Sequence, residues 1–258
     1  MEFYEILKFS FLISLVNLDE RNLGSFTISR PIISGVIFGL IFNNIFLGLY
    51  VGTIIEMFIV NLLPVGNFIA PSGAVITGII IYISNYFYMH EIEYIFPIIL
   101  LYGLSVGHIS KRVSRMLWVF DNSLVEKFIN KVKNGKIHFA TFNWISLIVS
   151  VFAFMLLCFI SIFFGIFIIN YISEFIVNNF VTKNILKFIF KYLPIFSLVY
   201  FLNIYDVPYK LWFIALGFLS AAILNLFILN SEIVFIITVV LFITIIFAWN
   251  VITAKLKI

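Results

Sequence analysis

Long runs of apolar residues, divided by short polar stretches, occupy most of this 258-residue chain. A helix needs about 20 consecutive apolar residues to cross a bilayer. Runs of that order predict spanning or partly spanning helices over residues 70–88, 92–109, 144–169, 211–229 and 233–249. A shorter run over residues 9–18 is not long enough to span alone. The pattern predicts an all-α, polytopic membrane protein folded as a transmembrane helix bundle.

The N-terminal third is interrupted. Asn43 and Asn44 divide the apolar region that starts at Pro31, and further prolines and a glycine follow it. Its first piece, residues 31–42, is too short to cross a bilayer, although proline suits the first turn of a helix. Irregular backbone is tolerated at membrane depth where protein buries it or where it lines a cavity. We therefore expect broken or re-entrant helices, which form substrate-region hairpins over residues 30–90. Two ordinary helices joined by a tight turn are the alternative.

The C-terminal spans are assigned to residues 144–250, with an amphipathic segment among them. Lysine recurs there at every fourth position: Lys183, Lys187 and Lys191. This spacing places the three side chains on one face of a helix. Residues 171–193 are therefore expected to lie along the membrane interface or to continue an angled helix. Pro194 is expected to end that helix before a short apolar piece, residues 195–204.

Composition supports the assignment to a membrane. Apolar residues make up 63% of the chain and charged residues 11%, against about 45–50% and 25% in soluble proteins. A soluble fold of this size cannot bury so much apolar surface, so we expect one integral membrane domain over residues 1–258. The acidic N-terminus lacks the positive start of a cleavable signal peptide, so internal segments are expected to direct insertion.

Positive charge is concentrated in one polar segment between the predicted spans. It holds seven of the 16 Lys and Arg residues, at positions 111, 112, 115, 127, 131, 133 and 136. Because basic residues favour the cytoplasmic side, we expect residues 110–140 to form a cytoplasmic loop. A docking surface for a cytosolic partner is the alternative. The net charge of +4 gives no reason to expect a nucleic-acid partner.

The candidate chemistry centres on one acid. Between Arg30 and Glu91 the chain carries a single charged side chain, Glu56. A charged group at the middle of a membrane helix costs roughly 2.5–3.5 kcal/mol, so such a residue is a functional-site candidate. A protonated Glu56 that holds two helices together is the alternative.

Neutral polar side chains accompany Glu56, and this combination suits a sugar, which needs hydrogen-bond acceptors and amides. The predicted substrate-binding residues are Glu56, Asn43, Asn44, Thr53, Asn61, Asn67 and Ser72. An ion pathway more often shows several charged residues. Nucleotide-binding, hydrolase and zinc-binding motifs are missing from the sequence. We therefore expect no catalytic residue, no metal site and no cofactor in this chain; another subunit would carry any chemistry.

Several short motifs also resemble a known family. Arg30-Pro31, the segment 48–57 with Gly52 and Glu56-Met57, and Ala70-Pro71 resemble the IIC component of the mannose/sorbose-type phosphotransferase system in order and spacing. Weaker similarities extend through residues 107–145 and 217–222. The sequence departs from the family pattern at three points. The pair Asn43-Asn44 stands where the family has Gly-Asp, Asn61 stands at or near a family glycine, and Ser72 stands where the family has an acid.

The resemblance implies a multi-pass sugar permease subunit of the bacterial inner membrane, a transport subunit without catalytic residues of its own. Such a subunit pairs with a IID membrane subunit in an oligomer, and the pair passes a mannose-class hexose inward by an elevator-like motion. Cytosolic IIA and IIB phosphocarriers relay phosphate from phosphoenolpyruvate through their histidines to the sugar. By this resemblance, Glu56 accepts hydrogen bonds from sugar hydroxyls or holds the re-entrant hairpin.

Two alternatives stay open at this point. The first is a non-transporting assembly or receptor subunit of the same architecture, suggested by the missing acids at Asn44 and Ser72. The second is an unrelated solute permease, for example the membrane part of a different energised transporter.

Overall fold

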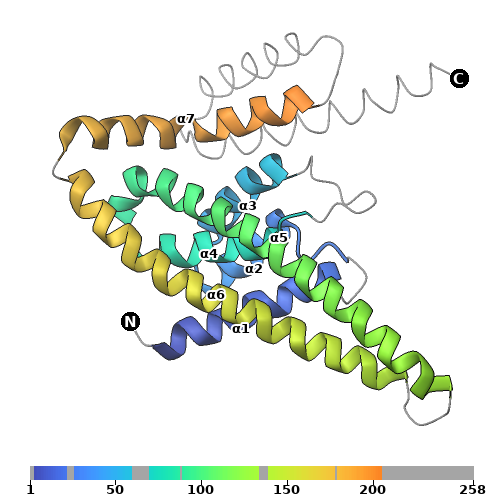
Figure 1. Ribbon diagram of the computed structural model, residues 1–258. Helices are drawn as coiled ribbons and strands as arrows, with labels where there is room; N and C mark the ends of the chain where they lie inside the picture. Colours follow the sequence, from blue (N-terminus) through green and yellow to red (C-terminus); the bar gives the residue numbers. More distant parts are fainter. Residues whose placement is uncertain are drawn as a thin grey trace, which may run out of the picture. The chain divides into compact units, whose positions relative to one another are not determined.

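The computed structural model describes residues 3–21, 26–59, 70–87, 89–133, 139–177 and 179–204. These residues form seven α-helices and no strand: α1 Phe3–Arg21, α2 Pro31–Ile41, α3 Ile45–Ile59, α4 Gly73–Tyr86, α5 Met89–Lys133, α6 Phe139–Val177 and α7 Phe180–Ile204 (Figure 1). The predicted all-α class is confirmed. Asn61, Asn67 and the predicted spans 211–229 and 233–249 lie outside the described residues.

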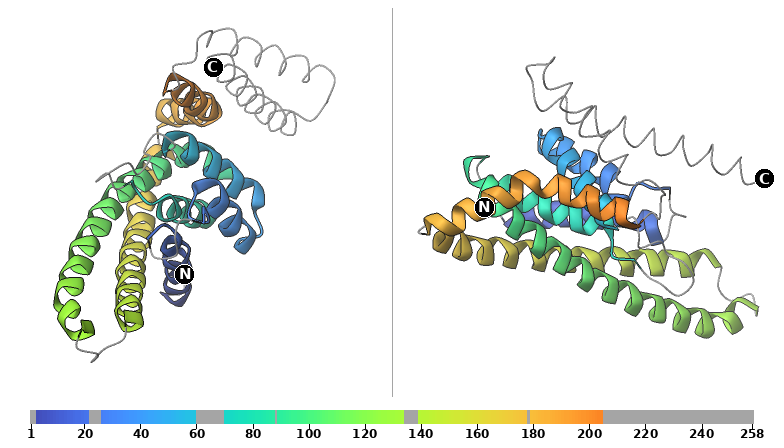
Figure 2. Two further views of the ribbon diagram at one scale, coloured as in Figure 1. Left: turned by 90° about the vertical axis from the view of Figure 1, so that its right-hand side faces the viewer. Right: turned by 90° about the horizontal axis from the view of Figure 1, so that it is seen from above.

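Helix α4 forms the centre of the described part of the chain. It packs against α1, α2, α3, α5 and α6, and every residue from Gly73 to Ser84 is buried (Figures 1 and 2). A helix that is apolar on all sides is stable only when protein or lipid surrounds it completely. Its 14 residues give a length of about 21 Å, less than the ~30 Å hydrocarbon thickness of a bilayer. Protein therefore surrounds α4 from Gly73 to Ser84, and only its last two residues are exposed.

Helices α2 and α3 form a hairpin whose two backbones touch. The facing residues are glycines at a spacing of four, two on each helix: Gly35, Gly39, Gly48 and Gly52. A Cβ atom added to Gly39 would lie 3.0 Å from the Cα of Gly48. We call these four residues the glycine seam. The pattern Gly-x-x-x-Gly, which allows close approach of membrane helices, occurs once on each of these two helices and is a signal from which the sequence could have predicted this contact.

Both helices of the hairpin are short. Their 11 and 15 residues correspond to about 17 and 23 Å, so neither crosses a ~30 Å hydrocarbon layer on its own. The structure therefore has two apolar helices where the sequence predicts an interrupted region, and they are joined by the tight turn that the alternative expects. Their depth in a bilayer stays a prediction, and the re-entrant form is the one that their lengths favour.

Within the described residues, three helices are long and apolar enough to cross a membrane, over Ile92–Glu126, Asn143–Ile176 and Phe180–Phe201. Helices α5 and α6 run side by side (Figure 2). Residues 110–133 of the predicted cytoplasmic loop are helical, because α5 continues to Lys133, and the side of the membrane that they face stays a prediction. Charged residues do not end a helix, and neither proline nor glycine occurs between His108 and Asn134.

The predicted end of a helix at Pro194 is also wrong. Helix α7 begins at Phe180 and continues through Pro194 to Ile204. Two of its three evenly spaced lysines contact the start of α5. Lys187 Nζ lies 2.9 Å from Glu93 Oε2, and Lys183 Nζ lies 4.7 Å from the centre of the Tyr94 ring. Two of the three lysines on this face of α7 therefore contact α5.

Candidate functional site

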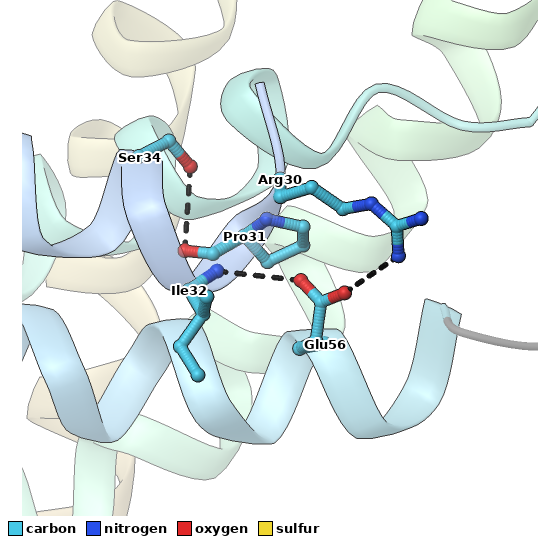
Figure 3. Close-up of polar contacts among 5 residues, drawn as sticks. All are labelled: Arg30, Pro31, Ile32, Ser34 and Glu56. Carbon is cyan, nitrogen blue, oxygen red and sulfur yellow. Dashed lines mark hydrogen bonds and ion pairs between the residues drawn. The ribbon is translucent and has the colours of Figure 1, made fainter. Parts of the chain in front are cut away.

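Glu56 is not isolated in the structure. It lies on α3 beside the first residues of α2, and its carboxylate has two polar partners there (Figure 3). Arg30 Nη1 lies 2.9 Å from Glu56 Oε1, and the backbone N–H of Ile32 donates to Glu56 Oε2 at 3.4 Å. Sequence reasoning missed Arg30 as a site residue, although Arg30-Pro31 was part of the motif that carried the family resemblance.

The hairpin geometry brings this ion pair together. Because α2 and α3 are antiparallel, the last turn of α3 lies beside the first turn of α2, where backbone N–H groups lack intrahelical partners. A carboxylate placed there pairs with the positive end of the helix as well as with Arg30. Glu56 therefore joins α2 and α3, as the helix-contact alternative expects, and it does so through an ion pair with Arg30.

Pro31 is the point where the motif segments converge. A Cβ atom on Gly52 of α3 would lie 2.6 Å from the backbone oxygen of Pro31, and one on Gly73 of α4 would lie 2.6 Å from Pro31 Cδ. The α2 helix is joined to α4 a turn later, where the hydroxyls of Ser34 and Thr77 lie 2.8 Å apart. The Arg-Pro motif, the motif around Glu56 and the start of α4 therefore form one site.

Asn43 and Asn44 form the turn of the hairpin. Asn43 has a φ of 55°, and its N–H donates to the Leu40 oxygen at 3.1 Å; the Asn44 N–H donates to the Gly39 oxygen at 2.8 Å. This pair of bonds is a Schellman motif, which satisfies the last carbonyls of α2. The Asn44 side chain then accepts from the Leu47 N–H at 3.1 Å and caps α3.

The predicted substrate-binding residues therefore do not form a single cluster. Asn43 and Asn44 precede α3, whereas Glu56 lies 12 positions after Asn44, or about 18 Å along the helix. Thr53 donates to the Tyr50 backbone oxygen at 3.0 Å, within α3. Of the described members of the set, Glu56 has the contacts expected of a ligand-binding group, and we assign the two asparagines to the turn.

This assignment gives a direct prediction for Asn43. Replacement by glycine keeps the positive φ accessible, so melting temperature and sugar uptake are expected to stay at wild-type levels. Asn43→Val forces a β-branched side chain into the left-handed region at a cost of about 1–2 kcal/mol. That cost corresponds to a melting temperature about 2–8 °C lower in thermal unfolding of the purified protein. Loss of uptake in Asn43→Gly at an unchanged melting temperature would instead assign the Asn43 amide to the substrate.

Ser72 is a buried capping residue at the start of α4. Its hydroxyl accepts from the Val75 N–H at 3.3 Å and donates to Asn17 Oδ1, and its own N–H donates to Ser110 Oγ at 3.2 Å. With 2% of its surface exposed, Ser72 has its polar atoms engaged within the protein. These bonds join α1, α4 and α5 beside the ion pair.

Asp19 and Glu20, at the end of α1, interact with residues that directly precede α2. The buried carboxylate of Asp19 accepts from the N–H groups of Phe26 at 2.7 Å and Ser29 at 3.1 Å. Desolvation and, as a smaller effect, the charge of Asp19 raise the pKa of the neighbouring Glu20 to about 7, and the charge of Arg30 opposes both effects. Arg30 therefore interacts electrostatically with the end of α1 in addition to pairing with Glu56.

Within the part of the chain that the structure describes, the contacts of the Arg30–Glu56 pair leave hydrogen-bonding capacity over. The Arg30 side chain is 47% exposed and that of Glu56 18%. A guanidinium carries five N–H donors, and a carboxylate can accept about four hydrogen bonds, so the contacts described above occupy only part of each group. Adjacent donors and acceptors of this kind suit the neighbouring hydroxyls of a sugar. Among the described residues, no group of three potential metal ligands is found.

Comparison with known proteins identifies the family. No curated protein sequence matches the chain significantly. A solved structure described as "Structure of membrane protein" superposes with a TM-score of 0.51 at 16% identity, covering 93% of this chain and 95% of the other, and so supports the fold. The family model of the sorbose-specific IIC component of the phosphotransferase system matches residues 3–246. The chain therefore belongs to this IIC family, and it is a membrane subunit of a phosphotransferase system for sugar transport.

Proposed function

We propose that this chain translocates a mannose-class hexose inward across the bacterial inner membrane, together with a IID subunit. Cytosolic IIA and IIB proteins deliver the phosphate, and the sugar binds at the Arg30–Glu56 pair. The single observation that supports this site is the convergence of three motif segments on one partly exposed ion pair at the base of the hairpin. The segment 110–140, which includes the polar end of α5, faces the cytoplasm in this proposal.

The capping contacts weigh against a non-transporting subunit. That alternative rests on Asn44 and Ser72, which stand where the family pattern has acids. Both side chains cap helices here, Asn44 at α3 and Ser72 at α4. Asn, Asp and Ser are nearly equivalent as helix caps, so these replacements preserve the structural role of an acid. Membership of the IIC family leaves no support for an unrelated solute permease.

The proposal predicts phosphate-dependent sugar uptake. Cells that express the chain with its IIA, IIB and IID partners are expected to accumulate radiolabelled mannose as the sugar phosphate, with saturable kinetics. Omission of IIB is expected to abolish accumulation, because the phosphoryl group comes from that partner. Parallel assays with glucose, fructose and sorbose define the substrate.

Calorimetry on the purified membrane complex, together with uptake, distinguishes a transporting subunit from a receptor subunit. Saturable hexose binding together with uptake supports the proposal. Hexose binding with no uptake in the complete system would instead support a receptor, and absence of binding to any of the four sugars would reject the assignment of a hexose.

A further inference from the structure

Helix α7 contains a backbone carbonyl that its own helix cannot satisfy. Pro194 lies inside α7 and has no N–H, so the carbonyl of Phe190, four residues earlier, lacks its usual intrahelical donor. An unsatisfied carbonyl is costly in a membrane, where water is not available to replace the donor. In this structure the hydroxyl of Tyr50, on α3, donates to the Phe190 oxygen at 3.3 Å.

The surrounding contacts show that this bond is part of a longer α3–α7 interface. The rings of Tyr50, Phe96 and Phe190 lie with their centres 5.4–5.6 Å apart. Two turns further along both helices, Ser197 Oγ lies 3.4 Å from the sulfur of Met57. Both polar contacts join residues 140 positions apart, so α3 and α7 run parallel and in register.

Glu56 lies next to this interface, one position before Met57. The contacts made by Tyr50 and Met57 fix α3 on either end of the two helical turns that lead to Glu56. The side-chain contacts with α7 therefore add to the packing of α3 against α2 and α4 in setting the position of the carboxylate.

We propose that Tyr50 is a positioning residue whose hydroxyl fastens α3, and with it Glu56, to α7 at the carbonyl that Pro194 leaves without a partner. The part of this inference that concerns the sugar rests on the proposed function. The part that concerns the two helices does not, because it follows from the bond and the proline alone.

The Tyr50 hydroxyl both satisfies the Phe190 carbonyl and joins α3 to α7. These two roles can be separated by giving the carbonyl an N–H donor from its own helix. Tyr50→Phe removes the fastening and leaves the Phe190 carbonyl unpaired, whereas the added change Pro194→Ala returns an intrahelical N–H to that carbonyl. Tyr50→Phe is therefore expected to lower the melting temperature of the purified membrane complex by about 2–4 °C with Pro194 present. In the Pro194→Ala background, the same change is expected to lower the melting temperature less, because the Phe190 carbonyl keeps an intrahelical donor and only the bond between α3 and α7 is lost.

Sugar affinity is expected to behave differently from stability. The restored N–H satisfies the carbonyl but does not reconnect α3 to α7. The KM for uptake of radiolabelled mannose is therefore expected to rise about three- to tenfold on Tyr50→Phe in both backgrounds, the equivalent of one hydrogen bond. A KM that returns to the parental value in the double variant would assign Tyr50 a purely structural role and overturn the proposal.

Tyr102 provides a matched control. Its hydroxyl donates to the Ser161 oxygen at 2.6 Å, but the residue four positions after Ser161 is Gly165, which has an N–H and lies inside α6. The effect of Tyr102→Phe on melting is expected to be the same with or without the Pro194→Ala change, because the sites are independent.

Three further outcomes support or reject the proposal for Tyr50. Equal loss of melting temperature on Tyr50→Phe in both backgrounds would refute the fastening. If Tyr50→Phe alone prevents folding, recovery of folded protein in the double variant supports the proposal and failure to recover rejects it. A wild-type complex that takes up no mannose would reject the proposed substrate, while the melting comparison would still decide whether Tyr50 serves the Phe190 carbonyl.

Discussion

Replacement of Glu56 by glutamine is expected to lower the efficiency of hexose uptake by about 10- to 100-fold. The change keeps the shape of the side chain but removes the charge that pairs with Arg30 and would accept sugar hydroxyls. Hydrogen bonds to a charged group contribute about 1.5–3 kcal/mol, which corresponds to a change of this size. The measurement is initial uptake of radiolabelled mannose, normalised to the amount of assembled complex in the membrane.

Assembly itself is expected to persist in the Glu56→Gln variant. The amide oxygen of glutamine can still accept from the Ile32 N–H, which the carboxylate now does at 3.4 Å. The glycine seam is also untouched by the change. Normal sugar accumulation by this variant would remove Glu56 from the binding site.

A second variant distinguishes sugar binding from charge balance. If Glu56 only neutralises Arg30, the double variant Arg30→Gln/Glu56→Gln should recover uptake, because no unpaired charge then remains. If the pair binds the sugar, the double variant should stay as inactive as Glu56→Gln. We expect the second result, since both side chains have exposed polar atoms and hydrogen-bonding capacity left over.

The second large effect is expected at the glycine seam. A Cβ atom on Gly48 would lie 2.9 Å from the Cα of Gly39 and would overlap the backbone oxygen of Gly35. Neither neighbour is a side chain that can rotate away, so Gly48→Ala must separate the two helices. Overpacking typically costs about 1–3 kcal/mol, and we expect at least the upper end of this range despite the better helix propensity of alanine. Thermal unfolding and the yield of folded membrane protein measure the effect.

Gly103 is the matched control for this substitution. A Cβ atom added to Gly103 would meet the side chain of Ile80, whereas the backbone oxygen of Ile76 would be 3.7 Å away. Because a side chain can adjust its rotamer, Gly103→Ala is expected to destabilise the protein less than Gly48→Ala. Equal effects at the two glycines would show that backbone contact is not what makes the seam sensitive.

The sequence predicted the helical class and the interrupted N-terminal third because both follow from local patterns. Apolar run length is a property of neighbouring residues, and so is the division of a run by Asn43 and Asn44. The partner of Glu56 depends instead on tertiary structure. Arg30 lies 26 positions earlier, and only the antiparallel packing of α2 on α3 brings the two side chains together.

The errors in the sequence prediction have a common cause. The segment 110–133 was assigned to a loop from its charge, and Pro194 was assigned to a helix end from its ring. In both cases the local preference, of charged residues for a loop and of proline for a helix end, is weaker than the effect of the surrounding structure. Helix α7 continues through Pro194 where a tyrosine from α3 satisfies the freed carbonyl, and no sequence rule connects residues 140 positions apart.

The glycine seam also limits where substrate preference can diversify. A contact made by backbone atoms alone presents no side chains that could be exchanged for others of different shape. Variants of this protein with altered sugar preference should therefore carry their changes at the ends of the hairpin, around Arg30 and Glu56, and leave the four glycines as they are.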